Sequence, residues 1–413
     1  MGAGISGLAL AWYLEKYLRN WEIILLEKEN RVGGWIRTNR IEGMLFEHGP
    51  RSFRMNQNIK LFDELGLTDQ LIEAKTKTKY IVYQQQLERV PEHLLSLLTT
   101  TLGRKCIKAL IGYPFRKKNT IEDQTVAEFF AQRFGQQFVD IFIDPLMAGI
   151  YAAHPSTLSK QACLPQFSKT IKVCSFLGGM QLLPDRLAEK IEAEICLNTT
   201  VRAIHEYKES VEVEHCHGSI HADMLFSTLP SIKNFLPKED PLSLLLPSVI
   251  HNSVIIVGIG FRESFLLQGF GFLAPSQEEK ELLGILFDSG VFPEQNGDYP
   301  TRLSVMLGGD RAPYLLALSD EQLQQLAQQF CKKYLKIFSE PAVSVVTRAH
   351  QGIPAYSVGH MKQVRCVEEH LQERRISILG TSLYGVSLTA CVTQAEIVAM
   401  TFAKNSRYSY MWG

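Results

Sequence analysis

The sequence predicts an α/β fold of mixed α+β character that comprises more than one domain. A glycine-rich turn at residues 2–7 leads into a helix-forming segment at 8–14, and an apolar run at 22–26 follows, as expected for a buried parallel strand. Apolar segments at 253–261 and 301–307 are typical of central strands in a second sheet. A chain of 413 residues also exceeds the size that one hydrophobic core usually organises.

The composition restricts the classes of partner. Basic and acidic side chains number 43 each, so the chain lacks the broad positive field of a nucleic-acid-binding protein. The 8 cysteines are scattered without a C-x-x-C pair, which favours reduced thiols and a reducing compartment. No apolar run reaches the roughly 20 residues that span a bilayer, and the N-terminus does not read as a signal peptide. We therefore expect a cytoplasmic protein that acts on a small molecule.

The glycine-rich turn reads Gly-Ala-Gly-Ile-Ser-Gly, which fits the pattern G-x-G-x-x-G. The apolar run after the helix ends at Glu27, 20 positions beyond Gly7. In a Rossmann-like unit the glycines let the backbone approach a diphosphate, the helix start attracts its charge, and an acid at this spacing binds ribose hydroxyls. The sequence therefore predicts a dinucleotide site. Met1 directly precedes Gly2, so the first strand of such a unit is absent from the chain as given; either the start has been placed too late or cofactor binding is compromised.

A second glycine pair lies in residues 31–38, Arg-Val-Gly-Gly-Trp-Ile-Arg-Thr, and residues 46–51 read Phe-Glu-His-Gly-Pro-Arg. Further characteristic segments follow in order at 144–156, 178–184, 198–201, 353–360 and 380–388. Together these segments resemble the protoporphyrinogen oxidase branch of the amine oxidase flavoprotein superfamily, from Gly2 to about Ala399. The chain departs from that pattern at residues 389–391, at Ala395 and at Met361.

The resemblance implies a non-covalently bound FAD. Its FAD contacts carry over to Gly2, Ala3, Gly4, Ile5, Ser6, Gly7, Glu27, Gly34, Trp35, Gly49, Pro50, Arg51, Ser52, Val201, Met361, Thr381, Val386, Ser387 and Leu388. Arg31 or Arg37 would add positive charge near the diphosphate, whereas Arg40 and Arg54 are interpreted as solvated arginines. The helix opened by residues 386–388 would direct N–H groups toward the flavin pyrimidine edge and favour the reduced flavin.

The same resemblance, with the local patterns, implies three domains. Residues 1–60, 166–230 and 350–413 are expected to form an FAD-binding domain, residues 61–90 and 231–349 a mixed-sheet substrate domain, and residues 91–165 a helical insertion. Within them we expect a hairpin of strands at 211–214 and 223–227, and an amphipathic helix at 320–338 capped by Ser319. The helical insertion combines leucines with basic clusters, which suits either peripheral contact with the inner face of the cell membrane or a helical core with a solvated basic rim.

By the resemblance, the protein oxidises protoporphyrinogen IX to protoporphyrin IX in haem biosynthesis, with molecular oxygen as acceptor. Hydride would leave a meso carbon for the flavin, and three cycles would remove six electrons. Lys79 occupies the position of a basic residue that contacts a substrate propionate. Residues 270–273 and 286–287 either line the pocket or are simply core. No catalytic acid or base and no metal ligand is assigned.

Several alternatives stay open. The substrate could be coproporphyrinogen III, oxidised by the same mechanism, or an amine or desaturase substrate of the wider superfamily. The chain could also be a non-catalytic interaction subunit of the haem pathway, and a homodimer is an alternative to a monomer. His215, Cys216, His217 and His221 are interpreted as part of a hairpin rather than a metal site, and no G-x-S-x-G motif supports a serine hydrolase.

Overall fold

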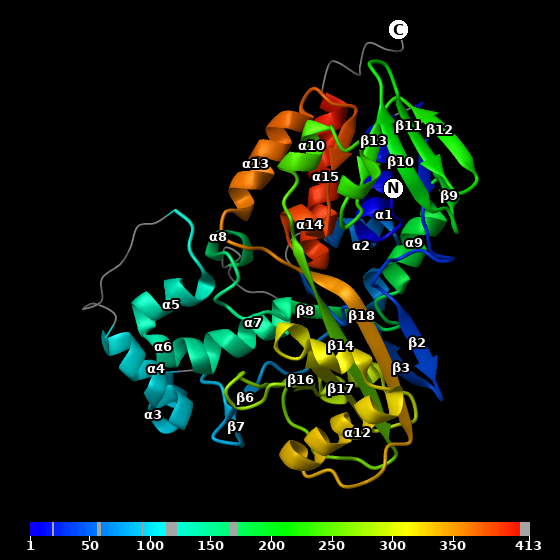
Figure 1. The fold of residues 1–413 in the computed structure, drawn as a ribbon. Helices are drawn as coiled ribbons and strands as arrows, with labels where there is room; N and C mark the ends of the chain where they lie inside the picture. The colour runs from blue at the N-terminus through cyan, green and yellow to red at the C-terminus, as the bar shows by residue number, and fades with distance from the viewer. Residues whose placement is uncertain (19, 56–58, 93, 113–121, 165–171, 405–413) are drawn as a thin grey trace.

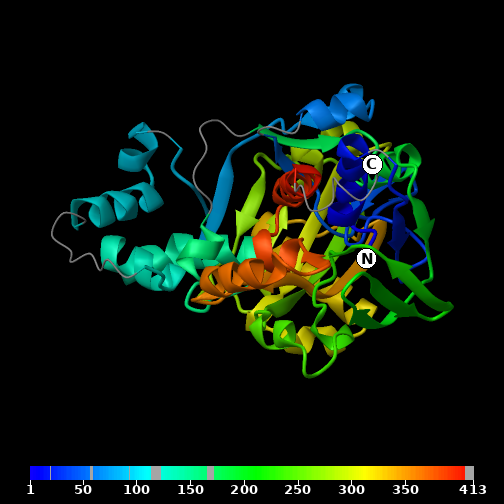
Figure 2. The same cartoon turned by 90° about the horizontal axis from the view of Figure 1, so that it is seen from above.

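The fold combines parallel and antiparallel sheets with a projecting helical region, which confirms the predicted mixed α/β class. The structure is a computed structural model and describes residues 1–18, 20–55, 59–92, 94–112, 122–164 and 172–404. The N-terminal helix and the C-terminal helix lie together at one end, and the largest sheet lies at the other (Figure 1). The helical region extends sideways from both, as the view from above shows (Figure 2).

One end of the fold is built around helix α1 (Ile5–Tyr17) and two short parallel pairs of strands. Strand β1 (Ile24–Leu26) pairs with β9 (Glu194–Cys196), and β13 (Leu225–Ser227) pairs with β19 (Ile376–Ile378). Helices α9 (Leu182–Lys190) and α15 (Leu388–Lys404) pack against α1 and enclose an apolar core with it. Segments from both ends of the sequence therefore form one layer of helices.

A three-stranded antiparallel sheet stands beside these pairs. It consists of β10 (Val201–Glu206), β11 (Val211–His215) and β12 (Gly218–Ala222). The hairpin predicted after residue 211 is present, but its return strand is β12. The expectation of a return strand at 223–227 is wrong, because residues 225–227 form β13 and pair with β19 instead.

The second sheet has seven strands in the order β18-β14-β17-β16-β15-β6-β7. Its strands are β18 (Val343–Ala355), β14 (Ile250–Phe261), β17 (Thr301–Gly308), β16 (Leu282–Leu286), β15 (Gly271–Leu273), β6 (Lys79–Tyr83) and β7 (Gln86–Arg89). Helix α12 (Asp320–Phe330) covers one face, and the Ser319 hydroxyl caps it as predicted, by accepting a hydrogen bond from the Gln322 N–H. Strand β18 crosses residue 350, which the sequence placed at the start of a different domain.

The opposite face of the seven-stranded sheet meets the hairpin of β2 (Thr38–Ile41) and β3 (Met44–Glu47). Side chains from β3 lie over two glycines of β14: a Cβ atom at Gly258 would meet Phe46, and one at Gly260 would meet Met44. A smaller sheet of β4 (Phe53–Met55), β8 (Lys172–Phe176) and β5 (Leu71–Glu73) continues from this hairpin. Helix α2 (Ile59–Glu64) packs with α1 in the same apolar core.

The projecting region contains α3 (Leu94–Thr99), α4 (Thr101–Gly112), α5 (Val126–Phe134), α6 (Gln136–Phe138), a π-helical turn (Val139–Ile143), α7 (Asp144–Tyr151) and α8 (Lys160–Cys163). Helix α5 begins with a capping box between Thr125 and Glu128. In the described part of the chain, no helix has both the length and the apolar character needed to cross a bilayer. The second predicted basic cluster, at residues 116–118, lies outside the described residues.

Candidate functional site

The glycine-rich turn places the start of α1 against two strands. Gly4 is the N-cap residue and supplies no side chain, so the first N–H groups of the helix have no side-chain cap. Gly7 must be glycine, because a Cβ atom there would lie 1.9 Å from the Gly2 carbonyl oxygen. The turn therefore combines close packing with uncapped donors at a positive helix end, which is the donor set that a diphosphate requires.

Glu27 follows β1 and is buried, with an exposed fraction of 7%. Its Oε2 accepts a hydrogen bond of 2.7 Å from the Ala3 N–H, and its Oε1 accepts one of 2.9 Å from the Glu29 N–H. The Glu27 carbonyl accepts from the Thr199 N–H at 2.7 Å, two residues before Val201 begins β10. The predicted acid, the turn and the start of β10 therefore lie together.

The second glycine pair packs directly on the first turn. The Gly33 N–H donates to the Ala3 carbonyl at 2.8 Å, and a Cβ atom at Gly34 would approach the Gly4 Cα to 3.3 Å. Arg31 does not extend toward the turn as a free charge. Its guanidinium donates to the carbonyls of Val32, Ile36 and Gly34, and burial followed by repulsion from Arg37 lowers its pKa. Arg31 thus holds the loop in shape.

The loop after β3 joins this region to the seven-stranded sheet. A Cβ atom at Gly49 would lie 2.0 Å from the carbonyl oxygen of Trp35, whose side chain is 45% exposed. The His48 Nδ1 lies 2.6 Å from the Thr347 Oγ1 on β18, and the Arg51 Nε donates to the Ser304 Oγ on β17 at 3.0 Å. The loop therefore contacts two strands of the large sheet.

Two buried nitrogens of this loop have no hydrogen-bond partner among the described residues: the Nε2 of His48 and one terminal nitrogen of Arg51. The Arg51 Nε forms an ion pair with the Asp288 Oδ1 at 3.5 Å. Buried polar groups are normally paired. A polar or anionic cofactor edge between the loop and the sheet would provide the missing acceptors, so the residues present fit such a group.

The C-terminal segments complete the same region. Thr381 begins α14 (Thr381–Tyr384), and the Tyr356 hydroxyl donates to its carbonyl and accepts from the Gly385 N–H. Helix α15 begins at Leu388, and the Ser387 Oγ accepts from the Ala390 N–H at 3.1 Å. The Thr389 hydroxyl donates to the Arg54 carbonyl at 2.8 Å, which ties the helix start to β4.

The predicted contacts are therefore brought together from three parts of the chain. Residues of the first turn, Glu27 and Gly34 contact one another, and Gly49 contacts the backbone of Trp35. Helix α15 packs along α1, and the Thr389 hydroxyl near its start donates to the Arg54 carbonyl of β4. Met361 lies in the first turn of α13 (His360–Leu371).

Lys79 is the first residue of β6 and its side chain is exposed. Desolvation by the surrounding chain lowers the pKa of Lys79, the positive charge of Arg54 lowers it further, and the negative charge of Glu92 raises it. Arg54 was interpreted from the sequence as a solvated arginine. Arg54 is exposed, and its positive charge is the second cause of the lowered Lys79 pKa. No sequence signal marked this pair, because Arg54 and Lys79 lie on strands of two different sheets.

Glu47 is a buried carboxyl group to which the sequence analysis assigned no role. Its Oε1 accepts from the Met180 N–H at 2.8 Å, and its Oε2 accepts from the Thr38 hydroxyl at 2.8 Å. Burial raises its pKa to about 7, against the two hydrogen bonds and the positive charges of Arg51 and Arg302. The sequence feature that could have identified Glu47 is its place in the motif at residues 46–51.

Two of the three aromatic residues considered for the pocket wall, Phe272 and Phe287, are core residues. Phe272 and Phe287 are 2% exposed, and Phe272 packs on Phe287 and on Tyr334 beneath the large sheet. Because successive side chains of a strand point to opposite faces, a different set of side chains lies on the other face of the large sheet. Ile256 pairs across the sheet with Met306 on one side and with Thr347 on the other, next to the contact from His48.

The histidine and cysteine group at the β11–β12 hairpin forms no ligand cluster. The rings of His215 and His217 lie 6.1 Å apart, and the His217 Nε2 lies 3.3 Å from the Asn198 carbonyl oxygen. Within the described residues, no group of three potential ligands is arranged to hold a metal ion. All 8 cysteines are free.

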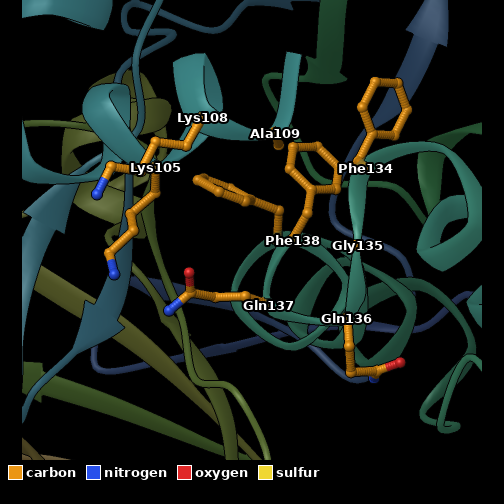
Figure 3. A pocket seen from close by; sticks show the side chains of 9 residues that line it. Lys105, Lys108, Ala109, Phe134, Gly135, Gln136, Gln137 and Phe138 are labelled. Carbon is orange, nitrogen blue, oxygen red and sulfur yellow. The ribbon is translucent and has the colours of Figure 1, made fainter. Parts of the chain in front are cut away.

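A separate cavity of about 180 Å³ lies in the helical region (Figure 3). Helix α4 contributes Lys105 and Lys108, and the facing helices contribute aromatic side chains. The rings of Phe134 and Phe138 lie 4.9 Å apart, and those of Phe138 and Phe142 lie 5.0 Å apart. The cavity therefore combines two cations with an aromatic wall, away from the glycine-rich turn.

Comparison with known proteins identifies the family. The profile described as "Flavin containing amine oxidoreductase" matches residues 5–377. The chain belongs to the flavin-containing amine oxidoreductase family. This confirms the resemblance inferred from the motifs, and with it an oxidoreductase that uses FAD.

Members of the flavin-containing amine oxidoreductase family resemble this chain over nearly its whole length. The protoporphyrinogen oxidase of Bos taurus is 30% identical, with 97% of this chain and 96% of the relative covered. The coproporphyrinogen III oxidase of Bacillus subtilis is 26% identical, with 96% and 95% covered. A crystal structure of an Exiguobacterium protein provisionally described as a protoporphyrinogen oxidase has a TM-score of 0.87 at 26% identity, with 97% of both chains covered.

Proposed function

We propose that this protein oxidises a porphyrinogen to a porphyrin with FAD as cofactor. The observation that carries the proposal is the 30% identity to the Bos taurus protoporphyrinogen oxidase across 97% of the chain. The coordinates support it, because the residues named from the motifs lie around one turn, one acid and one helix start. Oxidation of protoporphyrinogen IX in haem biosynthesis is the activity we favour.

The chain's own residues would hold the cofactor by backbone groups and a few side chains. The uncapped N–H groups of α1 and the backbone of the second glycine pair suit the diphosphate, and Glu27 suits the adenosine ribose. Val201 lies on the Glu27 side, which suits the adenine end. Trp35, the 49–52 loop and the starts of α14 and α15 lie toward the large sheet, which suits the flavin ring.

The bound flavin would supply hydride acceptance, and the protein would orient the substrate and exclude water. Met306, which is half-buried, lies on the sheet face opposite α12 and would give apolar surface to a flat macrocycle. Lys79 and Arg54 offer two cations for peripheral carboxylates. We keep the division into cofactor, substrate and helical regions, and the use of molecular oxygen as acceptor, as parts of this proposal.

Coproporphyrinogen III is the second candidate substrate. Relatives from Bacillus subtilis and Staphylococcus aureus that cover 96% and 97% of this chain carry the name coproporphyrinogen III oxidase. Such a substrate presents four carboxylates in place of two, and a second cation beside Lys79 would suit the larger number. The relative rates on the two porphyrinogens decide between them.

The helical region supports a further part of the proposal, contact with an anionic membrane surface from the cytoplasm. Leu98, Leu110 and Ile111 are exposed, and Lys105 and Lys108 line the cavity of the same region. Exposed apolar side chains beside lysines are typical of segments that lie at a lipid interface. A membrane-bound homodimer and a membrane-bound monomer are equally compatible with these residues.

The proposed function is tested by purifying the chain, recording its flavin spectrum, and adding each porphyrinogen in air. We expect porphyrin fluorescence to rise in step with oxygen consumption on at least one substrate. A flavin-loaded preparation that oxidises neither porphyrinogen would falsify the assignment, and turnover of amines in its place would favour an amine oxidase. Heat-denatured protein with free FAD is the matched control for spontaneous oxidation.

A further inference from the structure

The short helix α14 depends on other segments for its position. It has 4 residues and no side-chain cap, and it lies between Gly380 and Gly385, whose φ angles of 107° and 106° fall in the region that glycine favours. A helix of one turn is unstable in isolation, so contacts from elsewhere fix it. One of them is the Ser382 hydroxyl, which donates to the Pro230 carbonyl at 2.6 Å. Residues 386–388, which the sequence analysis assigned to FAD, follow directly, so the position of α14 decides where they lie.

Tyr356 supplies the contact that closes this turn. Its hydroxyl donates to the Thr381 carbonyl and accepts from the Gly385 N–H at 3.0 Å, so one side chain bonds to the backbone at both ends of α14. A protonated tyrosine hydroxyl can donate and accept at the same time. Burial raises the pKa of Tyr356, so the hydroxyl keeps its proton and both bonds persist at neutral pH.

A second side chain of the same segment bonds to the middle of α14. His360 begins α13, and its Nε2 lies 3.0 Å from the Leu383 carbonyl oxygen, which can only accept, so Nε2 carries the proton. Burial lowers the pKa of His360, which favours the neutral ring. The rings of His360 and Tyr356 pack with their centroids 4.5 Å apart, and both residues are buried. Together the two side chains hold α14 at three backbone positions.

The backbone of Tyr356 is itself fixed by the helical region. Tyr356 follows the last residue of β18, in the segment that joins β18 to α13 (Figure 1). Its carbonyl accepts from the N–H of Ser159, the N-cap residue of α8, at 2.7 Å. The Asp123 carboxylate accepts from the Ser159 hydroxyl at 2.8 Å and from the Gly359 N–H at 2.9 Å. These bonds on both sides of the segment set the place from which the Tyr356 hydroxyl reaches α14.

We propose that Tyr356 is a positioning residue for FAD, and that its hydroxyl holds α14 so that the backbone of residues 386–388 faces the flavin ring. The inference rests on the proposed function in that FAD binds at this turn. Backbone N–H groups at a helix start stabilise a polar edge best when their directions are fixed in advance. Without the hydroxyl, α14 turns more freely about its two flanking glycines, and part of the binding free energy of FAD is used to order it.

The test compares Tyr356→Phe with Tyr151→Phe. Tyr151 is the matched control, because it is also a buried tyrosine that packs on Tyr356, but its hydroxyl donates to the Cys163 carbonyl instead of to α14. Each variant loses one buried hydroxyl, so we expect similar losses of Tm. Only Tyr356→Phe should weaken FAD binding, about tenfold in a fluorescence titration, and speed amide exchange at Gly385 about tenfold or more.

Equal FAD affinity in the two variants would overturn the inference. Faster exchange at Gly385 without a change in FAD affinity would also overturn it, because the turn would then be loosened with no effect on the cofactor. A flavin-loaded wild type that oxidises neither porphyrinogen would contradict only the proposed function, since neither readout requires turnover.

A second pair of variants covers the case in which Tyr356→Phe does not fold. His360→Leu removes the donor to the Leu383 carbonyl, whereas His360→Gln keeps an N–H donor of similar reach. We expect weaker FAD binding in His360→Leu and recovery of most of the affinity in His360→Gln. Equal FAD affinity in these two proteins would show that contacts from this segment do not position the cofactor.

Discussion

Glu47 and Met180 lie 133 positions apart, and the carboxylate of one accepts a 2.8 Å hydrogen bond from the backbone N–H of the other. The same carboxylate accepts from the Thr38 hydroxyl, which in turn accepts from the Gln181 N–H. One buried group therefore connects β2 and β3 to the turn that precedes α9.

Glu47→Gln tests the electrostatics of that connection. Burial raises the pKa of Glu47 to about 7, so the folded protein binds the proton more tightly than the unfolded chain does. The contribution to stability is present below the unfolded pKa of about 4.3 and is lost as the pH rises through about 7. Relative to Glu47→Gln, the wild type should lose about 2–3 kcal/mol of unfolding free energy between pH 5 and pH 8. Denaturant titration at each pH measures this, and parallel curves for the two proteins would contradict it. Glu189→Gln, at an exposed site, is the control.

Substitutions at Gly4 and Gly7 should separate cofactor binding from stability. A Cβ atom at Gly7 lies 1.9 Å from the Gly2 carbonyl oxygen, so Gly7→Ala should destabilise the protein by about 1–3 kcal/mol despite the better helix propensity of alanine. At Gly4 the nearest atom to a Cβ lies 4.0 Å away and φ is −71°, so Gly4→Ala should leave the apoprotein stable. Its methyl group would instead obstruct the diphosphate and weaken FAD binding about tenfold or more. Unchanged FAD affinity in Gly4→Ala would argue against the placement of the diphosphate.

Lys79→Met should raise KM for a porphyrinogen about tenfold with little change in kcat, because it removes a charge-assisted contact that is equal in the bound and transition states. Lys79→Arg should restore most of the affinity. Lys77→Met, on the same exposed segment, is the matched control. Steady-state kinetics decide the outcome, and a fall in kcat at unchanged KM would remove Lys79 from substrate binding.

In the Arg54→Met variant, the rise of KM at alkaline pH should occur at a higher pH than in the wild type. Arg54 lowers the pKa of Lys79, and the positive form of Lys79 that attracts a carboxylate is lost as the pH rises through that pKa. Removing Arg54 therefore extends the positive form to higher pH while it also deletes one cation. If the pH at which KM rises is unchanged and only the value of KM differs, the two cations act independently.

Lys105→Glu combined with Lys108→Glu should reduce binding to vesicles that contain anionic lipid, and the difference should shrink at high salt. Sedimentation with anionic and with zwitterionic vesicles measures the effect. Lys332→Glu with Lys336→Glu, in the helical turn that follows α12, controls for net charge. Equal loss in both pairs would point to charge alone rather than to this surface.

The sequence predicted those parts of the fold that local patterns encode. The helix after the glycine turn, the acid at its spacing and the Ser319 cap all depend on neighbours within a few residues, and each is present. The predicted helix at 320–338 is shorter, because its regular part ends at Phe330 and a π-helical turn follows. A single local pattern could not reveal that change of pitch.

Long-range pairing explains what could not be predicted. The role of Glu47 depends on a turn 133 residues away, and the proximity of Arg54 to Lys79 depends on how β4 and β6 are placed by different sheets. Residues 225–227 read as the return strand of a hairpin, but the parallel edge of β19 pairs with them instead. Phe272 and Phe287 could not be assigned to a sheet face before the register was known.

The packing of α15 on α1 has a consequence for synthesis of the protein. Helices α1 and α15 share one apolar core, so α1, which is synthesised early, waits for α15 before its apolar side is covered. At ordinary translation rates that delay is some tens of seconds. A nascent chain that stops before residue 388 should therefore be a substrate for chaperones and proteases rather than a partly active enzyme.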